Sequence, residues 1–235
     1  FDLGQVLLNF DRARQCQQMA DVAGTTPEVV QAVVFHSGLH WKYEAGELTS
    51  QQFYDVFCRQ TDTRPKYEAL LHANSDIFRM NPTIAALVAA LEGAGHRLGV
   101  LSNTCEAHWN LVSQGQYGIL PRAFEQCVLS YEVGAIKPDE KIFRVAAERA
   151  GCAPAEIFYT DDTPGHVEAA KALGFDAVVY TDTATLAEEL ARTSRSLDRL
   201  ASELKEQPQS LVFGRKPGAP GPGESGFEAR TKAKP

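Results

Sequence analysis

The sequence predicts an α/β protein in which a doubly wound parallel sheet, of the Rossmann-like kind, carries a small helical cap domain. Two observations predict this class. From Asn81 onward, short apolar segments alternate with amphipathic helical segments, a pattern typical of parallel sheets with helices on both faces. Between about Asp11 and Phe78, by contrast, the sequence is helical in pattern and contains no convincing strand.

The chain begins in the middle of what reads as a buried central strand, and Asp2, in the opening segment FDLGQVLL, stands where that strand ends. Because residue 1 already lies within an apolar segment, we expect the first half of this strand to precede it. We place this strand in the same sheet as the later ones. The helical region is then an insertion after the first strand.

Helix signals divide the region from 11 to 78. RARQCQQMADVA follows Asp11, which we expect to cap its N-terminus, and it stops at Gly24. PEVVQAVVF follows Thr26 and has proline in its first turn. QQFYDVFCRQT is capped by Thr49 or Ser50. We expect a compact insert of about four helices.

The later part of the chain supplies the remaining elements. We expect strands in RLGVLSN (97–103), FEQCVLS (124–130), EIFYTDD (156–162) and DAVVYT (176–181). We expect helices in PTIAALVAALEGAGH (82–96), DEKIFRVAAERAGC (139–152) and GHVEAAKALGF (165–175). A further helical stretch follows the strand at 97–103, and one or two more helices continue from the last strand to about residue 207. The Gly- and Pro-rich end predicts disorder. The predicted domains are therefore a core of 1–10 and 79–207, a helical cap of 11–78 and a disordered tail of 208–235.

Composition excludes some classes of function. A net charge of −7 over 235 residues argues against binding of nucleic acid or anionic membranes, because both need a basic surface. The five cysteines include no CxxC pair and favour reduced thiols, buried as small apolar residues. With no apolar run of membrane-spanning length and no visible signal peptide, we expect a cytoplasmic protein. The sequence does not determine the oligomeric state.

Polar side chains follow the predicted strands at the edge where parallel sheets bind ligands. A carboxylate ends the first strand, a hydroxyl and an amide end the second, and a pair of carboxylates ends the fourth, while a lysine lies in the loop after the third. These residues are Asp2, Ser102, Asn103, Asp161, Asp162 and Lys137. The adjacent acidic pair repels itself unless a cation lies between the two carboxylates.

This set has a coherent chemical interpretation. Carboxylates from two strand ends bind a hard cation such as Mg²⁺, which also takes phosphate oxygens. Asp2 can attack phosphorus and form an aspartyl-phosphate that water hydrolyses. Lys137 and the cation then neutralise phosphoryl charge. Ser102, with Asn103 and Lys137, binds the phosphoryl group of a small substrate.

The order of these motifs resembles that of the haloacid dehalogenase-like hydrolase superfamily, in the phosphatase branch with a helical cap after the first motif. The matching segments are FDLGQVL at Asp2, VLSNT at Ser102, GAIKPDEKIF at Lys137 and IFYTDDTPGHVEAA at Asp161 and Asp162. The resemblance covers about residues 1 to 190. The chain is also similar to the phosphatase-like domain fused to some epoxide hydrolases and to bacterial sugar-phosphate phosphatases.

The resemblance implies a Mg²⁺-dependent phosphatase of small phosphorylated metabolites. It implies that Asp2, the main-chain carbonyl of Gly4 and Asp162 hold the metal, with Asp161 orienting its waters. Two departures matter. Many relatives carry a general acid, Asp, where this chain has Gly4, and many carry Asn or Asp where it has His166. Without that acid, we expect substrates whose leaving oxygen needs little protonation.

Two other functions stay open at this stage. A haloacid dehalogenase uses the same aspartate on carbon and has no use for Mg²⁺, so the acidic pair argues against it. A catalytically silent binding or scaffold protein is the alternative that Gly4 raises.

Several residues of the cap have an open role. His36 and His40 are spaced for metal binding, but no third ligand is evident, so we favour a structural or solvated role. Trp41, Tyr43 and Glu44 either face the substrate or belong to the core and surface of the cap.

Overall fold

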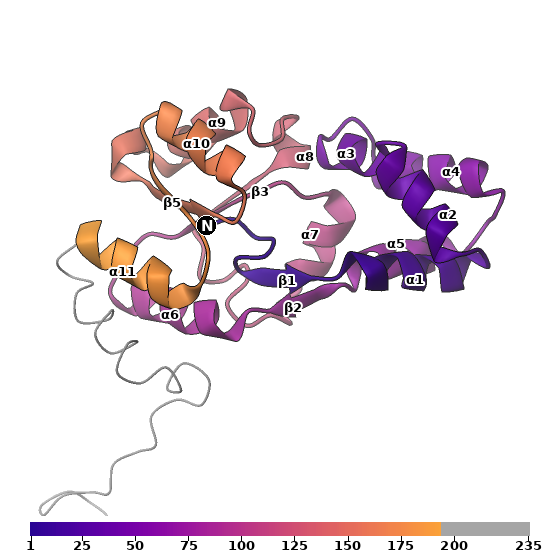
Figure 1. Cartoon of the computed structure of the whole chain (residues 1–235), viewed down its shortest axis with the longest axis horizontal. Helices are drawn as coiled ribbons and strands as arrows, with labels where there is room; N and C mark the ends of the chain where they lie inside the picture. Colours follow the sequence, from indigo (N-terminus) through magenta and orange to yellow (C-terminus); the bar gives the residue numbers. More distant parts are fainter. Residues whose placement is uncertain (194–235) are drawn as a thin grey trace, which may run out of the picture.

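The computed structural model describes residues 1–193 (Figure 1). The predicted helical continuation to about residue 207 and the predicted disordered tail of 208–235 lie outside the described residues. Within the described part, no helix combines the length and the apolar character that crossing a membrane requires.

Two parallel strand pairs make up most of the sheet. β3 (Gly99–Ser102) pairs with β4 (Gln126–Leu129), and Ser102 stands opposite Leu129 at the carboxyl end. β5 (Phe158–Asp161) pairs in the same way with β6 (Asp176–Val179). All four strands were predicted from their apolar segments, and each is shorter than the segment that predicted it.

The first two residues of the chain join these pairs into one sheet. The Phe1 nitrogen donates to the Gly99 carbonyl of β3 at 2.9 Å, and the Leu101 N–H donates back to the Phe1 carbonyl at 2.9 Å. On the other side, the Asp2 N–H donates to the Thr160 carbonyl of β5 at 2.9 Å. Residues 1 and 2 therefore occupy the central position of the sheet, as predicted.

Helices cover both faces of this sheet (Figure 1). They are α6 (Pro82–Gly93), α7 (Glu106–Val112), α8 (Ser130–Val133), α9 (Glu140–Ala150), a 3₁₀ turn η2 (Pro154–Glu156), α10 (Pro164–Ala172) and α11 (Thr183–Thr193). Val100 of β3 packs in one buried cluster with α6 and α11, and its neighbour Leu101 packs in another with α9 and α10. Neighbouring strand residues point to opposite faces, so these two clusters are the two halves of a doubly wound fold. The predicted fold class is confirmed.

A helical insert interrupts the core in the sequence and lies beside it, at the right of Figure 1. It comprises α1 (Arg12–Ala23), α2 (Pro27–Gln31), a π turn η1 (Ala32–His36), α3 (Leu39–Glu44), α4 (Ser50–Thr61) and α5 (Tyr67–Ser75). The expected caps are present: Asp11 accepts from the Arg14 N–H, Gly24 is left-handed at φ 67°, and Thr49 forms a capping box with Gln52. A separate apolar cluster stabilises the insert.

A two-stranded ribbon connects the core with the helical insert. β1 (Leu8–Phe10) pairs antiparallel with β2 (Phe78–Met80), with Phe10 opposite Phe78. The chain thus crosses from core to insert and back through hydrogen-bonded neighbours. The sequence did not predict this pair, because three residues are too few to show an alternating apolar pattern.

Candidate active site

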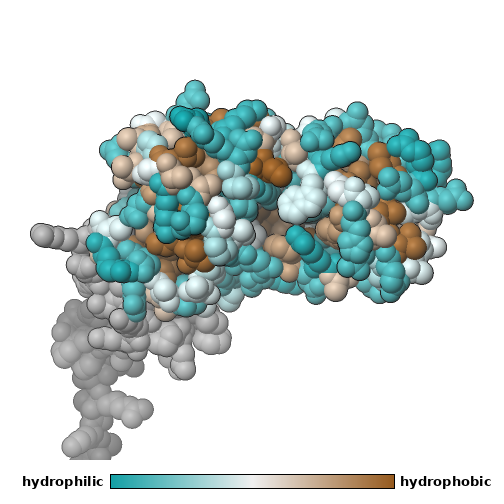
Figure 2. All heavy atoms as spheres, turned by 45° about the horizontal axis from the view of Figure 1, so that its top comes forward, coloured by the Kyte–Doolittle hydropathy of each residue, from teal (hydrophilic) through white to brown (hydrophobic). Residues whose placement is uncertain are grey.

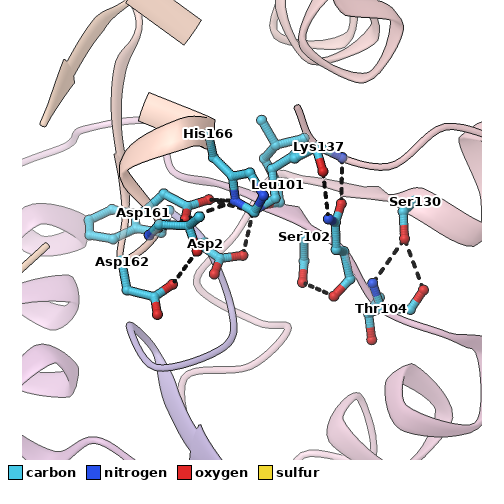
Figure 3. A network of polar contacts seen from close by, with 12 residues as sticks. Asp2, Leu101, Ser102, Thr104, Ser130, Lys137, Asp161, Asp162 and His166 are labelled. Atoms are coloured by element: carbon cyan, nitrogen blue, oxygen red, sulfur yellow. Dashed lines mark hydrogen bonds and ion pairs between the residues drawn. The ribbon is translucent and has the colours of Figure 1, made fainter. Parts of the chain in front are cut away.

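The carboxyl edge of the sheet brings the predicted site residues together (Figure 3). Asp2 follows the central segment, Ser102 is the last residue of β3, and Asp161 is the last residue of β5. Parallel strands end at a common edge, so their terminal side chains converge although they are far apart in sequence. Asp2, Ser102 and Asp161 are all buried.

Lys137 is the centre of this arrangement. Its side chain is buried, and Nζ lies 2.6 Å from Asp2 Oδ1 and 2.6 Å from Asp161 Oδ2. Nζ also donates to the Leu101 carbonyl at 3.0 Å and to the Tyr159 hydroxyl at 3.2 Å. One ammonium group thus fixes two carboxylates that come from different strands.

The loop after β3 holds the backbone of Lys137. The Lys137 N–H donates to Asn103 Oδ1 at 2.7 Å, and Asn103 Nδ2 donates to the Lys137 carbonyl at 3.0 Å. A second clamp lies next to it, where Ser130 Oγ accepts from the Thr104 N–H and donates to the Thr104 carbonyl, both at 2.9 Å. Both polar ends of the Asn103 amide are therefore occupied by Lys137. Ser102 Oγ donates to the Asn103 carbonyl at 3.2 Å.

Asp161 accepts hydrogen bonds from several directions besides Lys137. The Tyr159 hydroxyl donates to Oδ2, and the Thr163 N–H donates to Oδ1 at 2.8 Å. His166 Nδ1 lies 3.0 Å from Oδ1 and 3.1 Å from Oδ2. An ionised carboxylate only accepts, so Nδ1 of His166 carries the hydrogen. His166, whose role the sequence left open, orients Asp161.

Three carboxylates form a cluster with the geometry of a cation site. Asp2, Asp161 and Asp162 each offer an oxygen, and these oxygens lie within 4.8 Å of one another. Lys137 is the only ammonium that pairs with them within residues 1–193. Three negative charges against one positive charge leave an excess that a divalent cation balances, and oxygen ligands suit Mg²⁺. The residues therefore fit the ion that the sequence predicted.

The pKa values in this cluster reflect burial and charge. Burial raises the pKa of Asp2 to about 6, although the charge of Lys137 opposes the rise. Burial and the charge of Asp161 also raise the pKa of Asp162. Burial acts on Asp161 too, but the hydrogen bond from His166 and the charge of Lys137 outweigh it and lower its pKa. Burial works against the ammonium of Lys137, yet the charges of Asp2 and Asp161 raise its pKa above the usual value.

A cavity of about 590 Å³ lies above this cluster, between the core and the helical insert. Asp2, Ser102, Lys137 and Asp162 line it from the core, and Gly4 adjoins them. The space-filling view shows a hollow between the core on the left and the insert on the right (Figure 2). A ligand in this cavity would contact both parts of the molecule.

The structure shows which of Trp41, Tyr43 and Glu44 face the cavity and which belongs to the core of the insert. Trp41 and Glu44 line the cavity, with Trp41 49% exposed and Glu44 buried. His40 also lines it, and its Nε2 lies 3.1 Å from Glu44 Oε1. Tyr43, in contrast, is buried in the insert core and stacks on Phe53 with ring centroids 4.7 Å apart.

His36 and His40 do not form a metal site. His36 is exposed at the end of η1, whereas His40 is buried in α3 and paired with Glu44. Ser37 and Gly38 separate the two helices. Among residues 1–193, Asp2, Asp161 and Asp162 form the one group of three or more such side chains with metal-binding spacing.

Tyr159 and Arg12 are among the residues of the site that the sequence did not predict. Tyr159 lies two residues before Asp161 in β5, so both side chains point to the same side of the sheet. That spacing was a usable signal. Arg12 lines the cavity from the start of α1, and its place depends on how the insert packs, which no local pattern reveals.

Known proteins resemble this chain in both sequence and structure. A family model described as haloacid dehalogenase-like hydrolase matches residues 14–174. Pyrimidine 5'-nucleotidase YjjG of Escherichia coli is 28% identical over 160 residues, which are 64% of this chain and 70% of that protein. (S)-2-haloacid dehalogenase 1 of Pseudomonas sp. (strain CBS-3) is 28% identical over 99 residues, 41% of this chain and 42% of that protein.

The chain spans only part of some relatives. It matches acyl-CoA dehydrogenase family member 10 of Mus musculus at 25% identity over 162 residues, 66% of this chain but 15% of that protein. Among solved structures, a HAD family enzyme of Bacteroides thetaiotaomicron in complex with magnesium and inorganic phosphate superposes with a TM-score of 0.67. That enzyme is 26% identical, and the match covers 77% of this chain and 91% of the other.

Proposed function

The chain belongs to the haloacid dehalogenase-like hydrolases, and we propose that it is a magnesium-dependent phosphatase of small phosphorylated metabolites. One observation carries the proposal: Asp2, Asp161 and Asp162 form a cluster beside a cavity, and the ammonium group of Lys137 pairs with the first two. Phosphoryl transfer is catalysed mainly by positioning and by neutralisation of charge, and this cluster supplies both.

We assign the metal to Asp2, Asp162 and the main-chain carbonyl of Gly4, with Asp161 beside them. When bound there, the cation would neutralise phosphoryl charge and align the ester. The protein supplies the oxygen ligands and keeps Asp161 oriented through His166 and Lys137. The relative crystallised with magnesium and inorganic phosphate supports this assignment.

Asp2 is the proposed nucleophile. Lys137 holds Oδ1 at 2.6 Å, which leaves Oδ2 to attack phosphorus. An O–P bond forms to Asp2 as the bond from phosphorus to the leaving oxygen breaks, and water then hydrolyses the aspartyl-phosphate. The ammonium group of Lys137 keeps Asp2 ionised and offers its charge to the phosphoryl oxygens.

Ser102 and Asn103 have different proposed roles. Ser102 lines the cavity with its hydroxyl, and we assign it a hydrogen bond to a phosphoryl oxygen. Both ends of the Asn103 amide bind the Lys137 backbone. We therefore propose that Asn103 positions Lys137 and contributes to the part of the loop that contacts the substrate. The helical insert, with predicted bounds 11–78, is the proposed cap over the substrate.

The similarity to a 2-haloacid dehalogenase favours a second candidate. In that reaction an aspartate attacks carbon, and no divalent cation is needed. The cluster of three carboxylates argues against it, because a metal-free reaction gains nothing from their excess negative charge.

Hydrolysis of p-nitrophenyl phosphate tests the proposal. We expect turnover with Mg²⁺, loss of turnover in excess EDTA, and loss in Asp2→Asn, whose amide keeps the shape but is a poor nucleophile. Asp55→Asn is the matched control, because Asp55 is exposed on α4 and, within residues 1–193, is hydrogen-bonded only to Gln51. Chloride release from 2-chloropropionate that is insensitive to EDTA supports the dehalogenase instead. No turnover of either compound supports the binding or scaffold protein.

A further inference from the structure

Arg12 is an exposed cation at the wall of the cavity. Its guanidinium group has neither a hydrogen bond nor an ion pair with any part of the chain that the structure describes. Arg14, two residues later, donates to Asp76 Oδ2 at 2.8 Å and to the Asp76 carbonyl at 3.1 Å. Both arginines lie in the first turn of α1, where the helix dipole disfavours positive charge. Asp76 therefore neutralises Arg14, whereas Arg12 has no ion pair with an acid within residues 1–193.

Two aromatic rings fix the position of Arg12. Its Cζ lies 5.6 Å from the centroid of Phe10 and 5.4 Å from that of Phe35, within the range of cation–π contacts. Phe10 belongs to the ribbon and Phe35 to η1. These contacts engage the π faces of the rings and leave the N–H donors of the guanidinium unpaired. The side chain is therefore held in place with its hydrogen-bonding capacity unused.

The other charges around the cavity are already committed. Glu44, the acid on the insert side, pairs with His40 at 3.1 Å. Lys137 is taken by Asp2 and by the buried Asp161, and Asp2 and Asp162 belong to the proposed metal site. Burial acts against ionised Glu44, but the contact with His40 and, more weakly, the charge of Arg12 lower its pKa. Arg12 therefore interacts with Glu44 through space, while its N–H donors stay free to bind a ligand that enters the cavity.

We propose that Arg12 binds a second anionic group, carboxylate or phosphate, on the organic part of the phosphate ester. The inference rests on the proposed phosphatase function and narrows its substrate class to phosphorylated acids rather than phosphorylated neutral alcohols. A guanidinium matches either anion with two parallel N–H···O bonds. Trp41, half-exposed in the same cavity, offers an apolar surface to the scaffold that joins the two groups.

Matched aryl phosphates test this inference with Mg²⁺ present. We compare kcat/KM for 3- and 4-carboxyphenyl phosphate with the corresponding carbamoyl esters, which are neutral and similar in shape. A second arm compares 1,4-phenylene bisphosphate with 4-methoxyphenyl phosphate and separates a phosphate from a carboxylate. We expect the anionic ester to be favoured in at least one arm by about ten- to hundredfold, the range for hydrogen bonds between charged groups. The preference should appear mainly in KM.

Variants assign the preference to Arg12. Arg12→Met should reduce the anionic-to-neutral ratio to near one, and Arg12→Lys should restore part of it, because lysine keeps the charge but loses the two-pronged geometry. Arg59→Met is the control: Arg59 is exposed on α4, lies outside the cavity and has no ion pair within residues 1–193. It should leave the ratio unchanged.

The outcomes separate this inference from the phosphatase proposal. Turnover of neutral esters without an anionic preference in either arm, or a preference that survives in Arg12→Met, overturns the role of Arg12 alone. If no ester is hydrolysed, the phosphatase proposal fails, and calorimetry with the same esters still decides the inference. Tighter binding of the anionic ester that Arg12→Met abolishes supports the anion site, and equal binding of both esters overturns it.

Discussion

Acidification titrates two buried groups near the cavity with opposite effects on stability. His108 of α7 is buried, with Nε2 3.1 Å from the Asn74 carbonyl. Burial and, to a smaller extent, the charge of His40 lower the pKa of His108 to about 4. The unfolded chain therefore takes up a proton near pH 6.5, while the folded chain does not until about pH 4. The stability that this residue contributes is present above about pH 6.5 and is lost as the pH falls.

Asp2 acts in the opposite direction when no metal is bound. Burial raises the pKa of Asp2 to about 6, above the unfolded value of about 3.9. The folded chain therefore binds the proton first, and stability rises as the pH falls through about 6. Between about pH 7 and about pH 5, linkage gives a loss of about 2 kcal/mol from His108 and a gain of about 1 kcal/mol from Asp2. The two contributions together leave a loss of about 1 kcal/mol.

Urea unfolding in EDTA at the two pH values measures these contributions. We expect Asp2→Asn to lose about 2 kcal/mol on acidification, because only His108 still acts. We expect His108→Gln, which keeps a donor for the Asn74 carbonyl, to gain about 1 kcal/mol. Other carboxylates titrate in all three proteins and cancel in the differences. An equal change in the wild type and both variants would refute the reasoning.

Three further predictions concern the carboxylate cluster and its neighbours. Lys137→Met leaves Asp2 and Asp161 buried without their cation, so urea unfolding in EDTA should show a loss of about 3–5 kcal/mol; an unchanged midpoint would contradict the ion-pair geometry. Asp162→Asn should raise the Mg²⁺ concentration for half-maximal hydrolysis at least about tenfold, and an unaltered titration would remove Asp162 from the metal site. Gly4→Asp introduces a candidate general acid, and its Cβ would stand 3.1 Å from Phe10 Cε1, so that ring must shift slightly. Over phosphate esters of rising leaving-group pKa, the wild-type rate should fall steeply and the variant rate less steeply, whereas a flat wild-type series with rate-limiting chemistry means that another group supplies the proton.

The convergence of the site residues could be predicted from the sequence because strand ends are a local feature. Each of Asp2, Ser102 and Asp161 follows an apolar segment, and parallel strands must end at one edge. Lys137 lies between Asp2 and Asp161 because its positive charge is attracted to both carboxylates. The hydrogen bond from His166 to Asp161 could not be predicted from the sequence. The two residues are five positions apart across the start of a helix, and that spacing does not determine whether their side chains meet.

Other features depend on packing between distant segments. Asn103 follows Ser102, and its role in substrate binding stays a prediction; the structure adds that its amide bonds the backbone of Lys137, which lies 34 residues away in the sequence. Arg12 reads as an ordinary residue in the first turn of a helix, and only the placement of the insert brings it to the cavity. The alternation that reveals a strand needs more than the three residues of β1 or β2.

The ribbon of β1 and β2 makes the insert separable from the core in a geometric sense. Phe10 and Phe78 stand opposite each other across an antiparallel pair, so the chain leaves the core and returns to it at adjacent points. A chain that lacked everything between them could continue through a two-residue hairpin turn. The helical insert, with its Arg12 and Trp41, can therefore be replaced by an insert of different size. Asp2, Lys137 and Asp161 of the core would keep their positions relative to one another.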